Sequence, residues 1–274
     1  TMGDGIRLAL AVYLPNISIG ASDLAIDFRP PGEDTTVSAM LAAAGLSLTA
    51  HDMNSDQARY SQRVAMSGLD ISIDGEVPAH PAIVDLILGS GDEPGLLPTD
   101  AEIVVELADL PMSMILGIAD NVSLPPIEEM MSDDFDPTTL GLAGMALLSP
   151  ILSSPPAVVV KPSQISGGLI QATAEGRVEV SPFTEPNRAI GSVVMRLSGV
   201  ADVQAKVAQL MGELSQEDSR DAREAVEQLQ QLMGLVGMAS GFGIPTDDGA
   251  LEFIIDVPAG APANINGLPI PLNF

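Results

Sequence analysis

The stretch AGLSLTAHD (44–52) is followed by a close copy, SGLDISIDG (67–75). Each copy begins with a small residue and Gly-Leu, after which apolar and polar residues alternate with a period of two. This period is typical of a β-strand with one buried face. The apolar series are Leu46, Leu48 and Ala50 in the first copy and Leu69, Ile71 and Ile73 in the second. No catalytic motif lies near either copy, so we interpret the repeat as a structural module.

The same alternation recurs through the first 75 residues of the chain. It marks GIRLALAVYL (5–14), ASDLAIDFR (21–29), and the segments 36–50, 58–66 and 68–74. We therefore expect a meander of five or six antiparallel strands, although three consecutive alanines at 42–44 leave a short helix open. Pro and Gly residues in RPPGED (29–34) predict a turn.

The middle of the chain mixes helical and extended patterns. HPAIVDLIL (80–88) fits a helix as well as a strand, and AEIVVELADL (101–110) predicts a strand. PMSMILGIADNV (111–122) and TTLGLAGMALLS (138–149) predict helices, because a proline stands at or just before the first turn of each. An acidic, linker-like run occupies 128–136 between them.

The C-terminal part predicts strands that flank a pair of helices. We expect two strands within 155–180, a third over 189–200 and a last one over 251–257. The first helix has an apolar stripe of Val203, Val207, Leu210, Met211 and Leu214. The second has Ala222, Ala225, Val226, Leu229, Leu232, Met233 and Val236 at helical spacing. Ser215, with Asp218 three residues later, resembles a capping box and predicts the start of the second helix.

These patterns predict an α+β, β-dominated fold, in which a twisted antiparallel sheet of repeated strands is packed by amphipathic helices near 202–238. We divide the chain into residues 1–150, an N-terminal β-meander plus a short helical segment, and residues 151–274, a C-terminal β-sheet with a helix pair. One continuous domain is the alternative.

Composition excludes several classes of function. Of 274 residues, 46% are hydrophobic and only 3% aromatic, with no Trp and no Cys. Disorder over the whole chain is therefore excluded, as are disulfides, thiolate metal sites and cysteine nucleophiles. The 11 Lys and Arg residues against 37 Asp and Glu residues give a net charge of −26, which disfavours nucleic acids and anionic membranes as partners. The scarcity of aromatic residues disfavours carbohydrate chemistry.

Candidate catalytic and metal sites are few. His51 in AHDMNSD stands beside Asp52, Asn54 and Asp56, which alternate as calcium ligands do, but the run lacks the glycine and closing Glu of an EF-hand loop. A turn is the favoured interpretation. His80 and Ser90 fit loop and turn positions, and no nucleophile elbow or phosphate-binding loop occurs. We expect no enzyme activity and no cofactor.

Acidic clusters offer a second place to look for a cation site. The largest one combines Glu128, Glu129, Asp133, Asp134 and Asp136. Hard cations prefer preformed oxygen cages to such runs. Asp247 and Asp248 in PTDDG favour a turn.

The C-terminal pattern resembles a known family. It consists of GLIQATAEGRVEVSP (168–182), GSVVMRLSGVADVQAKVAQL (191–210), REAVEQLQQLMGLVG (223–237), LEFIIDV (251–257) and INGLPIPL (265–272). Over about the last 110 residues it resembles a family of exported alphaproteobacterial proteins, the domain of unknown function number 2125, and more distantly the YdgA-like exported proteins. The resemblance implies a periplasmic or cell-envelope location and a leader ahead of the TMGDGIRL with which the chain opens. It assigns no functional residue.

We expect a non-enzymatic envelope protein that binds an apolar ligand such as a lipid. The candidate ligand-binding residues are Leu210, Met211, Leu229, Met233 and Val236. The alternative is a structural or interaction subunit of an envelope protein assembly, with an envelope protein as partner. A calcium-dependent acidic protein is a third hypothesis.

Overall fold

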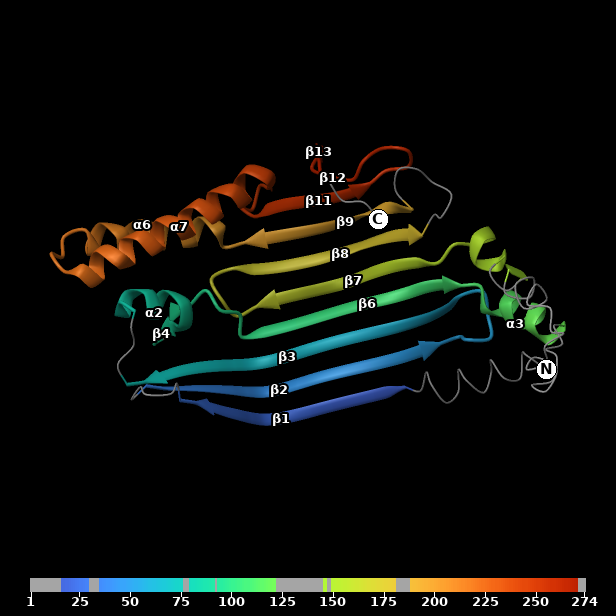
Figure 1. Ribbon diagram of the computed structural model, residues 1–274, viewed down its shortest axis with the longest axis horizontal. Coiled ribbons are helices and arrows are strands. Elements are labelled where there is room, and N and C mark those ends of the chain that lie inside the picture. The colour runs from blue at the N-terminus through green and yellow to red at the C-terminus, as the bar shows by residue number, and fades with distance from the viewer. Residues whose placement is uncertain are drawn as a thin grey trace, which may run out of the picture.

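The computed structural model describes residues 16–29, 35–75, 79–91, 93–121, 145–146, 149–180 and 188–270. Its main feature is one twisted antiparallel sheet of 11 strands (Figure 1). The strands lie in the order β1 (Ile17–Phe28), β2 (Thr36–His51), β3 (Ala58–Asp74), β6 (Asp100–Leu110), β7 (Ala157–Ser166), β8 (Gln171–Val180), β9 (Ala189–Ser198), β11 (Leu251–Val257), β12 (Asn264–Ile265) and β13 (Leu268–Pro269), and β10 (Ile244–Pro245) pairs with β11. The predicted fold class, α+β and β-dominated, is confirmed.

Several helices accompany the sheet in the described ranges. They include α2 (Pro81–Leu88), α3 (Met112–Asn121), α6 (Val200–Leu214) and α7 (Arg220–Phe242), and residues 149–153 are also helical. A small hairpin of β4 (Gly89–Ser90) and β5 (Glu93–Pro94) follows α2. Among these helices, none combines the length and apolar composition that crossing a membrane requires.

Most predicted elements are present, with some differences. Segments 58–66 and 68–74 form the single strand β3, and the alanines at 42–44 lie in strand β2. Segment 80–88, for which helix and strand were both open, contains helix α2. Among the other predictions, the strand at 5–14, the acidic run at 128–136 and most of the helix at 138–149 lie outside the described residues.

The predicted start of the second C-terminal helix is wrong. Ser215 is the C-terminal cap of α6, and its backbone N–H donates to the carbonyl of Met211. The N-cap of α7 is Ser219, whose hydroxyl accepts a hydrogen bond of 3.0 Å from the backbone N–H of Ala222. Asp218, expected to complete the capping box, instead forms an ion pair with Arg223.

The main core lies at one end of the sheet rather than along its middle. There α6 and α7 form a hairpin that packs against α2, β9 and β11. Val203, Val207 and Leu229 are among its largest fully buried side chains. A second, smaller cluster packs α3 against the start of β3 at the other end. Figure 1 shows α6 and α7 extending past the strand ends, and no helix crosses the middle of β1 to β8.

The three N-terminal strands share an irregular row. Asp23, Ala42 and Gly68 stand opposite one another, and both Asp23 and Gly68 have a positive φ. At this row the apolar alternation changes phase in all three strands. In β3, Ser67 and Gly68 are both exposed, whereas Met66 and Leu69 on either side are half-buried. The left-handed residues thus let the apolar residues continue on the same face.

Candidate functional site

The strand register assembles one apolar face that runs from β1 to β11. Directly opposed residues share a face of a sheet, so the register shows which side chains lie together. Val64 is opposite Ile103, Val105 is opposite Val160, and Val158 is opposite Val178. The series continues through the pairs Ile19 with Leu46, Leu46 with Val64, Ala174 with Met195, and Met195 with Phe253.

Charged residues are missing from this face in the strands that the structure describes. Its polar side chains include Tyr60 and Gln62 in β3 and Ser163 in β7. Ser163 is buried and already satisfied, because its hydroxyl donates to the carbonyl of Lys161 and accepts from the backbone N–H of Val104. The face is therefore aliphatic over eight neighbouring strands, from β1 to β11.

Among the described helices, α2, α6 and α7 cover this face at one end of the sheet, and α3 packs against the start of β3 at the other end. Met195, Leu197, Leu251 and Phe253 pack beneath the helix hairpin of α6 and α7. The side chains farther along the sheet stay open: Ile19 is 63% exposed, Val64 45% and Ile103 43%. Large apolar patches on a monomer mark a binding surface for a partner, a membrane or a ligand. We take this uncovered part, over β1 to β8, as the candidate site.

The opposite face of the same sheet carries the charges. Arg63 contacts Glu102 at 2.8 Å, and Lys161 contacts Glu106 at 3.0 Å. Arg177 pairs with two carboxylates, Asp109 and Glu179. Most of these charged side chains are partly exposed to solvent, where an ion pair contributes little to stability, but together they make one face hydrophilic.

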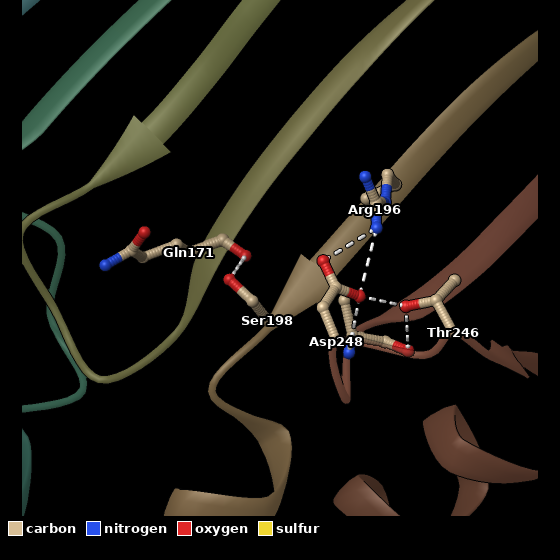
Figure 2. A network of polar contacts seen from close by, with 6 residues as sticks. Gln171, Arg196, Ser198, Thr246 and Asp248 are labelled. Carbon is tan, nitrogen blue, oxygen red and sulfur yellow. Dashed lines mark hydrogen bonds and ion pairs between the residues drawn. The ribbon is translucent and has the colours of Figure 1, made fainter.

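Arg196 in β9 completes this series of charges. Its guanidinium contacts the two carboxylate oxygens of Asp248 at 3.1 and 2.9 Å, as Figure 2 shows. The hydroxyl of Thr246 also donates to Asp248, and this bond, followed by the backbone N–H of Ala250 and the charge of Arg196, lowers the pKa of the Asp248 carboxyl. Asp248 lies in the turn between β10 and β11, where the sequence favoured a turn.

Two shallow depressions also lie on the charged side of the sheet. One, of about 370 Å³, includes Arg63, Glu102 and Gln164, and another, of about 280 Å³, includes Glu175 and Arg196. Both arginines already have carboxylate partners, so these hollows offer no unpaired arginine to an anionic ligand.

The ligand-binding residues expected from the sequence lie elsewhere. Leu229 and Val236 are buried in the main core. Leu210, Met211 and Met233 are partly buried and pack against that core. The structure thus brings all five together, but inside the helix hairpin and not on the open face. The period-two alternation in β1 to β8 was the sequence signal for the open face.

Each of the two histidines lies at the end of a helix or strand. His80 is the N-cap of α2: its Nδ1 accepts a hydrogen bond of 3.2 Å from the backbone N–H of Ala82, and its Nε2 lies 3.5 Å from Glu217. His51 is the last residue of β2. Ser90, expected in a turn, ends the short strand β4.

The run AHDMNSD (50–56) contains a turn, as favoured from the sequence, and two of its aspartates contact other side chains. Asp56 accepts a hydrogen bond from Ser113 of α3, and Asp52 lies 4.0 Å from Arg59. Within the described ranges, no group of three or more His, Asp or Glu side chains is arranged to hold a metal ion.

In the residues that the structure describes, the strands form one antiparallel sheet with one mainly aliphatic face and one charged face. No family model, no curated protein and no solved structure matches the chain.

Proposed function

We propose that this chain is a non-enzymatic cell-envelope protein that holds the hydrocarbon part of a lipid on its apolar sheet face. The observation that carries the proposal is the uncovered aliphatic face over β1 to β8. An exposed surface of this kind lowers its free energy when hydrocarbon replaces water against it, by roughly 25 cal/mol per Å² of apolar area.

The dimensions of the face suit lipid chains. From Ala101 to Leu107 the apolar series of β6 covers six residue steps, or about 20 Å at the usual rise of a strand. One leaflet of a bilayer has a hydrocarbon depth of about 15 Å, half of the full core. The six uncovered strands β1, β2, β3, β6, β7 and β8 have five spacings of about 4.8 Å between them, which gives a width of about 24 Å. Several hydrocarbon chains fit side by side on such a surface.

The residue types favour a lipid over a protein partner on this face. Interfaces between proteins obtain most of their binding energy from Trp, Tyr and Arg anchors. The aromatic side chains on the described part of the face include Phe28, Tyr60 and Phe253; Phe253 is already buried under the helices, and Phe28 is the last residue of the edge strand β1. Small and branched aliphatic side chains bind hydrocarbon through area alone, without directional anchors.

The charge distribution favours a lipid whose headgroup has no net negative charge. The protein carries a net charge of −26, and the cations Arg63, Lys161, Arg177 and Arg196 are paired with carboxylates on the opposite face. An anionic headgroup would meet repulsion within about 10 Å at 0.1 M salt.

A pair of single substitutions tests lipid binding. Ile103→Glu places a charge on the open apolar face, whereas Gln164→Glu adds the same charge on the opposite face. Delipidated protein is incubated with phosphatidylcholine and phosphatidylglycerol of identical acyl chains, and bound lipid is measured by native mass spectrometry. We expect the wild-type protein and Gln164→Glu to retain phosphatidylcholine and Ile103→Glu to lose it. A wild-type protein that retains neither lipid contradicts the proposal.

The envelope location and the kinship with domain of unknown function number 2125 rest on the resemblance of the C-terminal sequence. Fractionation of cells that express the gene from its native locus tests the location. Recovery of the protein only with cytoplasmic markers contradicts it.

A second candidate function is an interaction subunit of an envelope assembly. The observation that favours it lies on α7, where Leu235, Met238 and Phe242 form a stripe and are 64%, 59% and 44% exposed. Helices with such a stripe commonly dock into a groove of another protein. Co-purification of one stoichiometric partner, lost in Leu235→Asp and retained in the lipid-face variant Ile103→Glu, would favour this function.

A further inference from the structure

Strand β1 forms an open edge of the sheet in the part of the chain that the structure describes. All 12 residues of Ile17–Phe28 are exposed, and β2 is the neighbour of β1 on its inner side. Natural edge strands are commonly kept short or carry Lys or Pro, which prevent pairing with another chain. The sequence ISIGASDLAIDF is 12 residues long and has no Lys or Pro, and its charged residues are Asp23 and Asp27. A long edge of this kind is suited to pair with a further strand.

The residue pattern of β1 is complementary to itself in the antiparallel direction. The apolar residues are Ile17, Ile19 and Ala21 before the irregular row, and Leu24, Ile26 and Phe28 after it. The change of phase at Asp23 falls at the middle of the strand. Two antiparallel copies centred there place Ile17 opposite Phe28, Ile19 opposite Ile26, and Ala21 opposite Leu24. Every apolar residue of one copy thus meets an apolar residue of the other on the same face.

The polar residues of β1 agree with this register. Asp27 falls opposite Ser18 of the second copy, and Asp23 falls opposite Ser22. The inner side of the strand already shows such a pair, because Ser38 of β2 stands opposite Asp27 and donates a hydrogen bond of 2.7 Å to it. The two Asp23 carboxylates flank the symmetry axis diagonally and make the closest like-charge contact of the arrangement.

We propose that two copies of this chain pair antiparallel through β1, about a two-fold axis between Ser22 and Asp23. The axis stands perpendicular to the sheet, so the two sheets become one, and their apolar faces lie on the same side. The interface is isologous, as closed two-fold dimers require. This proposal does not depend on lipid binding, but a dimer of this kind doubles the width of the candidate lipid surface.

A charge-exchange pair of double variants tests the interface in the full chain. Ile19→Lys with Ile26→Lys sets like charges opposite each other twice in the dimer. Ile19→Lys with Ile26→Glu removes the same apolar groups but sets opposite charges there. Within one chain positions 19 and 26 are about 23 Å apart along the strand, so the two variants differ little as monomers. Circular dichroism melting curves check that both fold alike.

Sedimentation velocity over a concentration series gives the oligomeric state. We expect the wild-type protein to be a dimer, the Lys/Lys variant to be monomeric, and the Lys/Glu variant to dimerise about thirtyfold more tightly than the Lys/Lys variant. Asp23→Asn, which tolerates a positive φ and removes the like-charge contact, is expected to tighten the dimer. A monomeric wild-type protein overturns the proposal. Equal dissociation constants for the two double variants, both folded, overturn the β1 register.

Discussion

Substitution of Gly199 by Ala is expected to destabilise the protein strongly. Gly199 joins β9 to α6 with a φ of +82°, and a Cβ at this position would lie 1.8 Å from the backbone oxygen of Leu169. The left-handed conformation alone costs a residue with a Cβ about 1–2 kcal/mol. The backbone at Leu169 cannot retreat freely, because its N–H donates to the carbonyl of Gly95 at 2.7 Å, and losing that bond costs about 1 kcal/mol more. The expected loss is therefore about 2–3 kcal/mol.

A glycine in the adjacent helix gives the matched control. Gly212 lies in α6, and a Cβ there meets no atom within 4 Å. Gly212→Ala should stabilise the protein by about 0.5–1 kcal/mol, since Ala is the better helix former. Gly199→Asn adds a second comparison: Asn tolerates the left-handed region but still carries a Cβ, so this variant should remain destabilised.

Urea unfolding followed by far-UV circular dichroism measures these differences. With a slope of about 2 kcal/mol/M, Gly199→Ala should lower the midpoint by about 1 M or more. Surface substitutions typically change stability by no more than about 0.5 kcal/mol. If Gly199→Ala stays within that range of the wild-type protein while Gly212→Ala is stabilised, then β9, α6 and the β7–β8 turn do not pack closely around Gly199.

Three further substitutions probe other parts of the fold. Gly68→Ala should destabilise β3, because φ is +65° and the new Cβ would lie 2.7 Å from the Cβ of Ala42, and a lowered thermal midpoint would show it. Ser219→Ala should cost about 1 kcal/mol by removing the N-cap of α7, measured by urea unfolding; an unchanged midpoint would contradict this cap. The Asp248 carboxylate contributes stability that is fully present above the ordinary Asp pKa of about 3.9 and is lost as pH falls through the lowered pKa of the folded state. Asp248→Asn should therefore be less stable than the wild-type protein at pH 7, and the difference in unfolding free energy should vanish in acid.

The strands were predictable from the sequence because each has one apolar face. The period of two located β2, β6 and β11 to within a residue or two. It divided β3 in two, however, because Gly68 resembles a chain break in the sequence, whereas in the structure its positive φ shifts the phase within a continuous strand. Local sequence cannot distinguish these two outcomes, since pairing with the neighbouring strands keeps the chain extended.

The candidate site was less predictable. The sequence shows which residues are apolar, but it does not show where the helices dock. The stripes of α6 and α7 resembled a ligand surface, yet Leu229 and Val236 are buried where the helices meet each other and the sheet. The same docking leaves Val64 and Ile103 uncovered. The start of α7 was misassigned for a related reason: Asp218, three residues after Ser215, pairs with Arg223 and leaves Ser219 to cap the helix.

The strand order has a consequence for how the molecule unfolds. In the large sheet the described strands from β1 to β9 lie in the order of the chain, β1-β2-β3-β6-β7-β8-β9, so each pairs with its neighbours along the sequence and the β4–β5 hairpin stands apart. Stability in such a chain approaches a sum of nearest-neighbour terms, as in repeat proteins. In the monomer, opening then spreads inward from β1, which lacks a core of its own, while the end held by α6 and α7 unfolds last. Amide hydrogen exchange of the monomeric Ile19→Lys/Ile26→Lys variant should accordingly show protection that rises strand by strand from β1 towards β9, so that cooperativity is graded along the sheet rather than shared by the whole molecule.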